Sequence, residues 1–285
     1  MKKTVLLGVL SWAMMALPGA AYTVNMSSAF VPDFGQFEVL EYVSYSPYAL
    51  KVINGETFLA NPEESPGYHF AEAWTSLEVG LGHGVSTSLV VPYDIWSQFD
   101  GQDGAAGLYD LTWTVSRKLW ESDLNAGRVR FRMDLATGNP DKGLGAGVPG
   151  LGFEHASDYK LTPQLSAYLN LNYFYRMRRT MVDEEGIFLT SWSGQRVQAN
   201  TALEWALNDS WSLILEQMAS WEEPSQENRV PDAESGSLLV QLAPGVTWAL
   251  SPQLAFQASV MLPVLRQGYQ DAYRWSVVFG TVLDF

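Results

Sequence analysis

The 285-residue sequence has no cysteine, only three histidines, and few basic residues: 17 Lys and Arg stand against 31 Asp and Glu. Without cysteine, no disulfide can stabilise the fold. The formal net charge of -14 argues against nucleic acid as a partner, because phosphate neutralisation needs a basic surface. His69, His83 and His155 are too scattered for a metal site of ordinary spacing. We therefore expect no metal and no cofactor.

Long apolar runs are missing as well, apart from the first residues. No later stretch reaches the roughly 18 apolar residues of a membrane helix. The opening segment, MKKTVLLGVLSWAMMALPGAA, joins Lys2 and Lys3 to an apolar run that ends in small residues. This pattern is typical of a secretory signal peptide. We expect residues 1–21 to be that signal peptide, which would export the chain to a Gram-negative envelope.

Aromatic residues, in contrast, are abundant, with 11 Trp, 13 Tyr and 13 Phe. Most lie near the ends of about twelve segments, many of which alternate polar and apolar residues. Each segment is close to the roughly 9 to 11 residues that a tilted strand needs to cross a bilayer. The expected strands span residues 37–48, 68–81, 85–93, 107–120, 127–138, 149–159, 164–177, 195–207, 210–221, 236–249, 253–263 and 273–285.

The alternation is clearest in RVRFRMDLATG, which starts at Arg128. Its charged face carries Arg128, Arg130, Arg132 and Asp134, and its apolar face carries Val129, Phe131, Met133 and Leu135. An arginine at the lipid midplane costs roughly 2 to 4 kcal/mol. The charged face is therefore expected to face a lumen and the apolar face to contact lipid. A secreted soluble sandwich, with these faces reversed, is the alternative fold.

Short and long connections alternate along the chain. Turns such as GHG and ND separate longer polar connections such as ANPEESPG and EEPSQENRVPDAESG. Outer-membrane barrels alternate in this way, with short periplasmic turns and long external loops. We predict an all-β fold: a transmembrane antiparallel up-and-down β-barrel of the outer-membrane type, with about 12 strands. It would cover residues 37–285, with residues 22–36 as an N-terminal segment in the periplasm or the lumen.

Strand phase gives a set of candidate lumenal residues. The inward arginines need carboxylate or amide partners. The alternation along the strands makes Asp110, Asp134, Glu204 and Glu216 the inward candidates. The predicted pore-lining residues are Arg128, Arg130, Arg132, Asp134, Asp110, Arg196, Glu204 and Glu216. Two interpretations stay open: a charged constriction that selects solutes by sign and size, or a salt-bridge ladder that fills the barrel and fixes its register.

Most aromatics, Trp74 and Tyr109 among them, are expected at the two lipid interfaces. Tyr168 and Phe174 are expected to point inward, where they could stack an aromatic solute. The glycine-rich GLGAGVPGLG lacks the Gly-Lys-Ser/Thr ending of a phosphate-binding loop. A hydrolase would need a His, a Ser and a third orienting group, and His155 with its nearby serine is expected on an outward face. We expect no catalytic site.

Two segments resemble a known family. GLYDLTWTVSRKLW, from residue 107, and LATGNPDKGLGAGVPGLGFE, from residue 135, are similar to the paired signature of the MetA-pathway of phenol degradation family of outer-membrane transporters. The matching residues are Gly107, Asp110, Leu111, Thr137, Gly138, Gly143, Leu144, Gly145 and Gly147. Tyr109 replaces a family glycine, and Ala136 stands where the family often has proline. The resemblance implies an outer-membrane barrel associated with uptake of aromatic or apolar compounds.

The expected function is porin-like: passive, selective passage of small molecules through a narrow lumen lined by charged residues. The expected location is the bacterial cell outer membrane, as a multi-pass barrel. A structural sheath that holds a partner, such as a redox protein, across the membrane is the alternative, and an outer-membrane enzyme is a third. Expected partners are outer-membrane lipid and lipopolysaccharide, and the barrel assembly machinery, which would recognise the strand ending in Phe285.

Overall fold

The structure is a computed structural model of the chain. It describes residues 28–47, 49–53, 56–59, 69–99, 102–104, 106–142, 144–182, 188–192, 194–227, 230–231, 236–268, 270–273 and 275–285. The expected signal peptide, residues 1–21, lies outside the described residues. Within the described ranges, no helix is both long enough and apolar enough to span a membrane.

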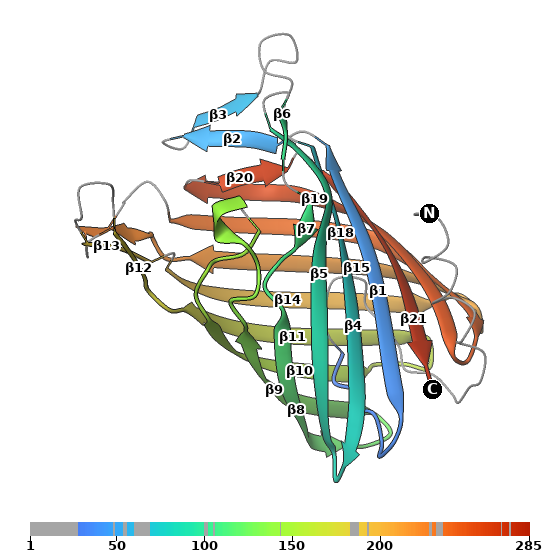
Figure 1. The fold of residues 1–285 in the computed structure, drawn as a ribbon. Helices are drawn as coiled ribbons and strands as arrows, with labels where there is room; N and C mark the ends of the chain where they lie inside the picture. Colours follow the sequence, from blue (N-terminus) through green and yellow to red (C-terminus); the bar gives the residue numbers. More distant parts are fainter. Residues whose placement is uncertain are drawn as a thin grey trace, which may run out of the picture.

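Twelve of the described strands form one closed antiparallel barrel, in which each strand pairs with its neighbours in sequence order (Figure 1). They are β1 (Phe37–Pro47), β4 (His69–Gly82), β5 (Val85–Phe99), β8 (Thr112–Glu121), β9 (Asn125–Asp134), β10 (Gly150–Lys160), β11 (Leu165–Arg176), β14 (Gln195–Ala206), β15 (Trp211–Glu222), β18 (Ser237–Ser251), β19 (Leu254–Gly268) and β21 (Ser276–Asp284). The predicted fold class, an antiparallel up-and-down barrel of 12 strands, is confirmed.

The first and last strands close the barrel. β1 pairs with β4 on one side and with β21 on the other, where Val43 faces Phe279. At the end of this seam the backbone of Phe37 and that of Phe285 exchange two hydrogen bonds of 3.0 and 2.8 Å. Among the twelve described wall strands, closure leaves none with an unpaired neighbour side, which is what a strand-built protein needs in lipid.

Several strand boundaries differ from the expected ones, most of all in β5, β8, β9 and β19, the last of which continues to Gly268, beyond residue 263. β5 continues to Phe99, beyond residue 93. β8 begins at Thr112 rather than 107, because Gly107 and Leu108 form the separate strand β7 (Gly107–Leu108) against β5. β9 ends at Asp134, because the following residues turn away into a loop that binds back to Asp110.

The long connections gather at one end of the barrel and the short turns at the other (Figure 1). The short turns include the one at His83, which has a positive φ of 54° between Gly82 and Gly84. The long connections contain β2 (Ala49–Ile53), β3 (Glu56–Leu59), β6 (Gln102–Asp103), β7, the 3-10 helix η1 (Pro140–Lys142), β12 (Arg179–Val182), β13 (Phe188–Trp192), β16 (Gln226–Glu227), β17 (Val230–Pro231) and β20 (Gln270–Tyr273).

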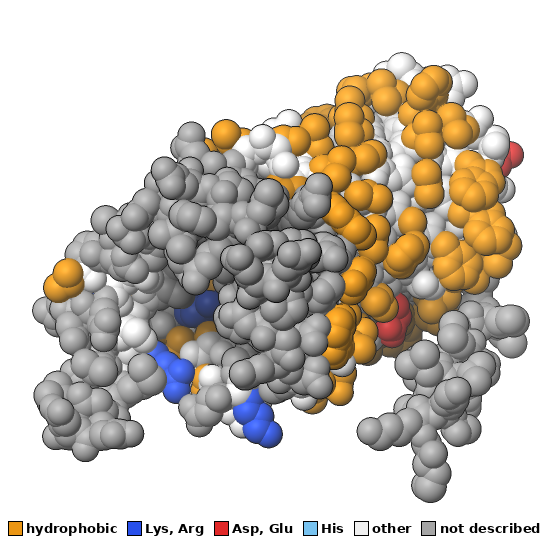
Figure 2. All heavy atoms as spheres, turned by 90° about the horizontal axis from the view of Figure 1, so that it is seen from above, with side chains coloured by type: hydrophobic (Ala, Val, Ile, Leu, Met, Phe, Trp, Pro, Cys, Tyr) orange, Lys and Arg blue, Asp and Glu red, His pale blue; other side chains and the backbone are white. Residues whose placement is uncertain are grey.

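The barrel wall is apolar outside and polar inside. Hydrophobic side chains cover much of the visible outer wall in Figure 2, and Leu77, Leu215 and Phe279 are among those exposed. Ser86, Ser116, Asn170 and Glu216 point inward and are almost fully buried. A soluble sandwich would reverse these faces, so the alternative fold is excluded.

Residues 28–36, called the N-terminal segment below, lie in the lumen at the short-turn end. The backbone N–H of Ala29 donates to Asp158 Oδ2 at 2.8 Å, and Arg128 Nη1 donates to the carbonyl oxygen of Phe30 at 2.6 Å. Val31 is almost fully buried. The segment passes so close to β4 that a side chain at Gly80 would collide with the Asp33 carbonyl.

Candidate functional site

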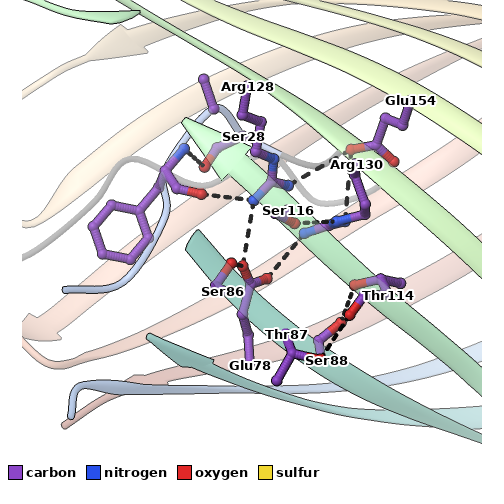
Figure 3. A network of polar contacts seen from close by, with 12 residues as sticks. Ser28, Glu78, Ser86, Thr87, Ser88, Thr114, Ser116, Arg128, Arg130 and Glu154 are labelled. Carbon is purple, nitrogen blue, oxygen red and sulfur yellow. Dashed lines mark hydrogen bonds and ion pairs between the residues drawn. The ribbon is translucent and has the colours of Figure 1, made fainter. Parts of the chain in front are cut away.

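Four charged side chains form a network inside the barrel, toward its short-turn end, and Figure 3 shows their contacts. Arg130 Nη2 lies 2.9 Å from Glu78 Oε2, and Arg130 Nη1 lies 3.5 Å from Glu154 Oε1. Arg128 is 3.8 Å from Glu78 Oε1 and 3.6 Å from Glu154 Oε1. Two positive charges therefore share two negative charges. We call these four residues the lumenal ion-pair network.

The network extends along the inner surface of the wall from β4 to β9, and the strands between them carry small inward side chains. Glu78 is on β4 and Arg130 on β9, and β5 and β8 lie between them. Ser86 of β5 and Ser116 of β8 have no measurable exposure, and each takes part in the network. Ser86 donates a hydrogen bond to Glu78, and Ser116 accepts one of 3.0 Å from Arg130 Nε. Larger side chains at Ser86 and Ser116 would occupy the space through which Arg130 reaches Glu78 (Figure 3).

The partners of Arg128 and Arg130 differ from those that strand phase suggested. Sequence reasoning missed Glu78 and Glu154. Glu154 faces Arg130 directly in the β9–β10 register, so the right alignment of those two strands would have identified it. Glu78 lies 52 residues before Arg130, and only the curvature of the wall brings the two together.

Of the four carboxylates proposed from sequence as partners of the inward arginines, Asp134 pairs with one of them, and the other three have other contacts. Asp134 binds Arg132 through two hydrogen bonds of 2.8 and 3.1 Å, and it also accepts one from Thr112. Glu204 accepts a 2.5 Å hydrogen bond from the hydroxyl of Tyr168. Glu216 is fully buried on β15, and Asp110 binds the backbone of a loop.

A cavity of about 600 Å³ lies above the network, toward the long connections. We call it the chamber. Its lining residues are Glu72, Trp74, Val90, Pro92, Tyr109, Asp110, Thr112, Arg132, Asp134, Gly145, Ala146 and Arg176. In Figure 2, Lys and Arg side chains are visible in a hollow at this end. Trp74 and Tyr109 line the chamber, so their expected place at the lipid interface is wrong. Trp74 shares the inward phase of Glu72 and Glu78 on β4.

The two segments that resemble the family signature contact each other at the chamber. Asp110 accepts hydrogen bonds from the backbone N–H of Gly138 at 2.9 Å and of Ala146 at 2.6 Å. Gly145 has a φ of +110°, and a side chain there would collide with the Asp110 carboxylate. The glycines therefore let the loop backbone close onto Asp110, which supports the wall of the chamber.

Three arginines surround one phenyl ring beside the chamber. The guanidinium carbons of Arg132, Arg176 and Arg196 lie 5.2, 5.6 and 5.5 Å from the centre of the Phe174 ring. Phe174 and Tyr168 are both buried inside the barrel, on the inward side that their strand phase predicts. Arg196 thus faces Phe174 and stands apart from the lumenal ion-pair network.

The His155–Ser157 pair lies on β10 and forms a 2.8 Å hydrogen bond between Ser157 Oγ and His155 Nε2. The His155 ring lies 5.7 Å from the Trp120 ring, and its register neighbours are Val129 and Leu171. This pair is on the outer face, in the apolar surface. In the part of the chain that the structure describes, no three His, Asp or Glu side chains are grouped to hold a metal ion.

Comparison with known proteins gives one family match and several structural matches. The chain is similar to the COG4313 outer membrane channel from Pseudomonas putida F1, with 12% identity and a TM-score of 0.77, over 92% of this chain and 100% of that one. It also resembles the NanC porin, with 10% identity and a TM-score of 0.52, over 87% of this chain and 98% of that one. At these identities the likeness shows the outer-membrane barrel fold.

No curated protein matches the chain. The model of the family described as "Putative MetA-pathway of phenol degradation" matches residues 64–272, which cover the barrel from the approach to β4 up to β20. The chain is therefore an outer-membrane β-barrel that belongs to this family.

Proposed function

We propose that the protein is a passive, selective channel that lets small molecules cross the outer membrane through a narrow lumen lined by charged residues. The main support for the proposal is the presence of the chamber inside the barrel. Barrels of about eight strands are filled by their own side chains, and those of sixteen or more leave a wide channel. This 12-stranded barrel encloses about 600 Å³ of open space above a constricted floor. The space suits a small solute.

The constriction is built from two parts. The lumenal ion-pair network projects from the wall, and the N-terminal segment lies against it, because Arg128 contacts both Glu78 and the Phe30 carbonyl. The two interpretations of the arginines therefore describe one structure: the network braces the wall and also narrows the lumen.

The comparisons support a transport function. The COG4313 protein is described as an outer membrane channel and NanC as a porin. The family description refers to phenol degradation, and Trp74, Pro92 and Tyr109 give the chamber an apolar wall. Both observations favour aromatic or apolar compounds among the solutes. The sheath alternative is less well supported, because the N-terminal segment already occupies the lumen where a partner chain would pass.

The test is conductance of the refolded protein in planar bilayers, with and without the change of Arg128, Arg130 and Arg132 to Ser. We expect the wild type to have a small conductance. The variant leaves Glu78, Glu154 and Asp134 uncompensated, so its ion preference should move toward cations. Arg117→Ser, which removes an exposed charge outside the network, is the matched control and should not shift the preference.

Folding of each variant is checked first by its heat-dependent migration in gels. If wild type and variants are all electrically silent, and liposomes that contain the protein admit no solute in swelling assays, the channel proposal is wrong.

A further inference from the structure

The arginine group around Phe174 carries more positive charge than its contacts balance. Arg132 is paired with Asp134. Among the described residues, Arg176 and Arg196 have no carboxylate oxygen within 4.0 Å, and the ring of Phe174 is the contact they share. Glu222 faces Arg196 in the β14–β15 register and contributes negative charge there. At least one guanidinium group therefore lacks a direct counter-ion.

The contacts with the ring leave hydrogen-bond donors of Arg176 and Arg196 available, and Arg132 keeps Nη1, because its Nε and Nη2 bind Asp134. A guanidinium group that lies over a ring uses its flat face, while its N–H groups point outward along its edge. That edge matches the two oxygens of a carboxylate. Phe174 holds three such groups close together without neutralising them, so the ring preorganises a site for an anion.

Arg132 and Arg176 also line the chamber, so a solute in the chamber can contact the arginine group. Trp74 of β4 and Val90 and Pro92 of β5 also line the chamber. The other acidic lining residues are engaged elsewhere: Asp110 binds the loop backbone, Asp134 binds Arg132, and Glu72 accepts a 3.1 Å hydrogen bond from Ser44. The part of the chamber lined by Arg132 and Arg176 is thus cationic, and the part lined by Trp74, Val90 and Pro92 is mostly apolar.

We propose that the chamber contains a binding subsite for small organic anions with one carboxylate and an apolar body. The carboxylate binds the guanidinium edge of Arg176 and Nη1 of Arg132, and the apolar body packs against Trp74 and Pro92. Arg196, which also lies beside the Phe174 ring, adds positive charge. Glu72, on the same wall as Trp74, disfavours a second carboxylate at the far end of the ligand. The subsite rests on the proposed channel function, since a solute must reach the chamber.

Calorimetric titration of the full barrel in detergent tests the subsite, with benzoate, hexanoate, acetate and benzyl alcohol as probes. We expect saturable binding of benzoate and hexanoate. Acetate lacks the apolar body and benzyl alcohol lacks the charge, so both should bind at least ten-fold more weakly. Arg176→Gln should raise the benzoate dissociation constant at least ten-fold, and Arg176→Lys should restore only part of the loss.

The matched control is Arg178→Gln. Arg178 is two residues further along the chain and lies over Trp192, outside the chamber. Its variant loses the same charge and should bind benzoate within two-fold of the wild type. The proposal is overturned if benzyl alcohol binds as tightly as benzoate, if benzoate does not saturate, or if Arg176→Gln binds it as the wild type does.

The two proposals fail in different ways. If neutral solutes enter liposomes but benzoate does not bind, the channel stands and the subsite is wrong. If benzoate binds and yet no solute crosses, the subsite stands and the channel is wrong.

Discussion

Glu78 and Glu154 neutralise the positive charge of two arginines inside this barrel. Each contacts both Arg128 and Arg130, so that no member of the group is left without an opposite charge. Glu78 and Arg128 are almost fully buried. Water screens such groups poorly, and the loss of one partner leaves a buried charge that the remaining contacts cannot balance.

The first prediction follows from this arrangement. Glu78→Ala removes the 2.9 Å contact to Arg130 and the acceptor for Ser86, and it leaves Glu154 as the one ion-pair partner that the two arginines share within the network. We expect the free energy of unfolding to fall by about 3 kcal/mol, measured by urea denaturation in lipid vesicles. The control is Glu121→Ala, which breaks an exposed pair with Lys118 and should cost about 1 kcal/mol or less. Equal urea midpoints of unfolding for the two variants would show that the network contributes nothing to stability.

At the scale of elements, the N-terminal segment and the loop after β9 narrow the lumen from opposite ends. The N-terminal segment is held at the short-turn end by Asp158 and Arg128. The loop after β9 is held at the other end by Asp110. Neither belongs to the barrel wall, and each depends on a few polar contacts. Such segments lie at the low end of local stability and can move while the wall remains folded.

The second prediction concerns the N-terminal segment. A chain without residues 22–33 loses the contacts at Asp158 and Arg128 and should leave the short-turn end of the lumen open. We expect a single-channel conductance several-fold above that of the wild type, recorded in planar bilayers. The control is Phe34→Ala in the full-length chain, because Phe34 is exposed and its loss should leave conductance unchanged. Unchanged conductance after the deletion would mean that the segment does not limit passage.

In the whole molecule, apolar side chains contact the lipid bilayer instead of packing into an apolar protein core. Small polar residues and ion pairs fill the interior, and leucine and aromatic side chains cover the outside. The apolar cluster of Trp211, Trp248 and Phe256 lies beside the short turns, with ring centres 5.7 Å apart. Aromatic girdles of this kind mark the level of the lipid head groups. Leu207 lies in the short turn that precedes Trp211, near that level, and Leu215 lies further along β15, toward mid-strand.

The third prediction uses two leucines with nearly equal exposure and different depth. Leu215 is 49% exposed and Leu207 is 51% exposed. Leu215→Arg should lower the free energy of unfolding in vesicles by about 2 to 4 kcal/mol, and Leu207→Arg by about 1 kcal/mol at most. Lipid penalises charge according to depth, whereas water does not. Equal effects of the two changes would contradict the proposed position of the wall in the membrane.

The sequence by itself determined the barrel. Strand number, the approximate spans and the direction of most side chains follow from alternation and from loop length, because both are local and the cost of charge in lipid does not depend on any partner. Arg128, Arg130, Asp134 and Glu204 point inward for this reason. The same phase places Trp74 inward, whereas its residue type favours the lipid interface, and the structure follows the phase.

Tertiary structure alone decided which inward residues meet. Glu78 reaches Arg130 across two intervening strands because the wall curves and its serines are small. Arg132, Arg176 and Arg196 converge on Phe174 from three strands, β9, β11 and β14. Strand register and barrel closure set these distances, and neither is encoded in the local pattern of any one strand. The alternation could show that charges face the lumen, whereas only the closed barrel shows which are paired and which remain available to a solute.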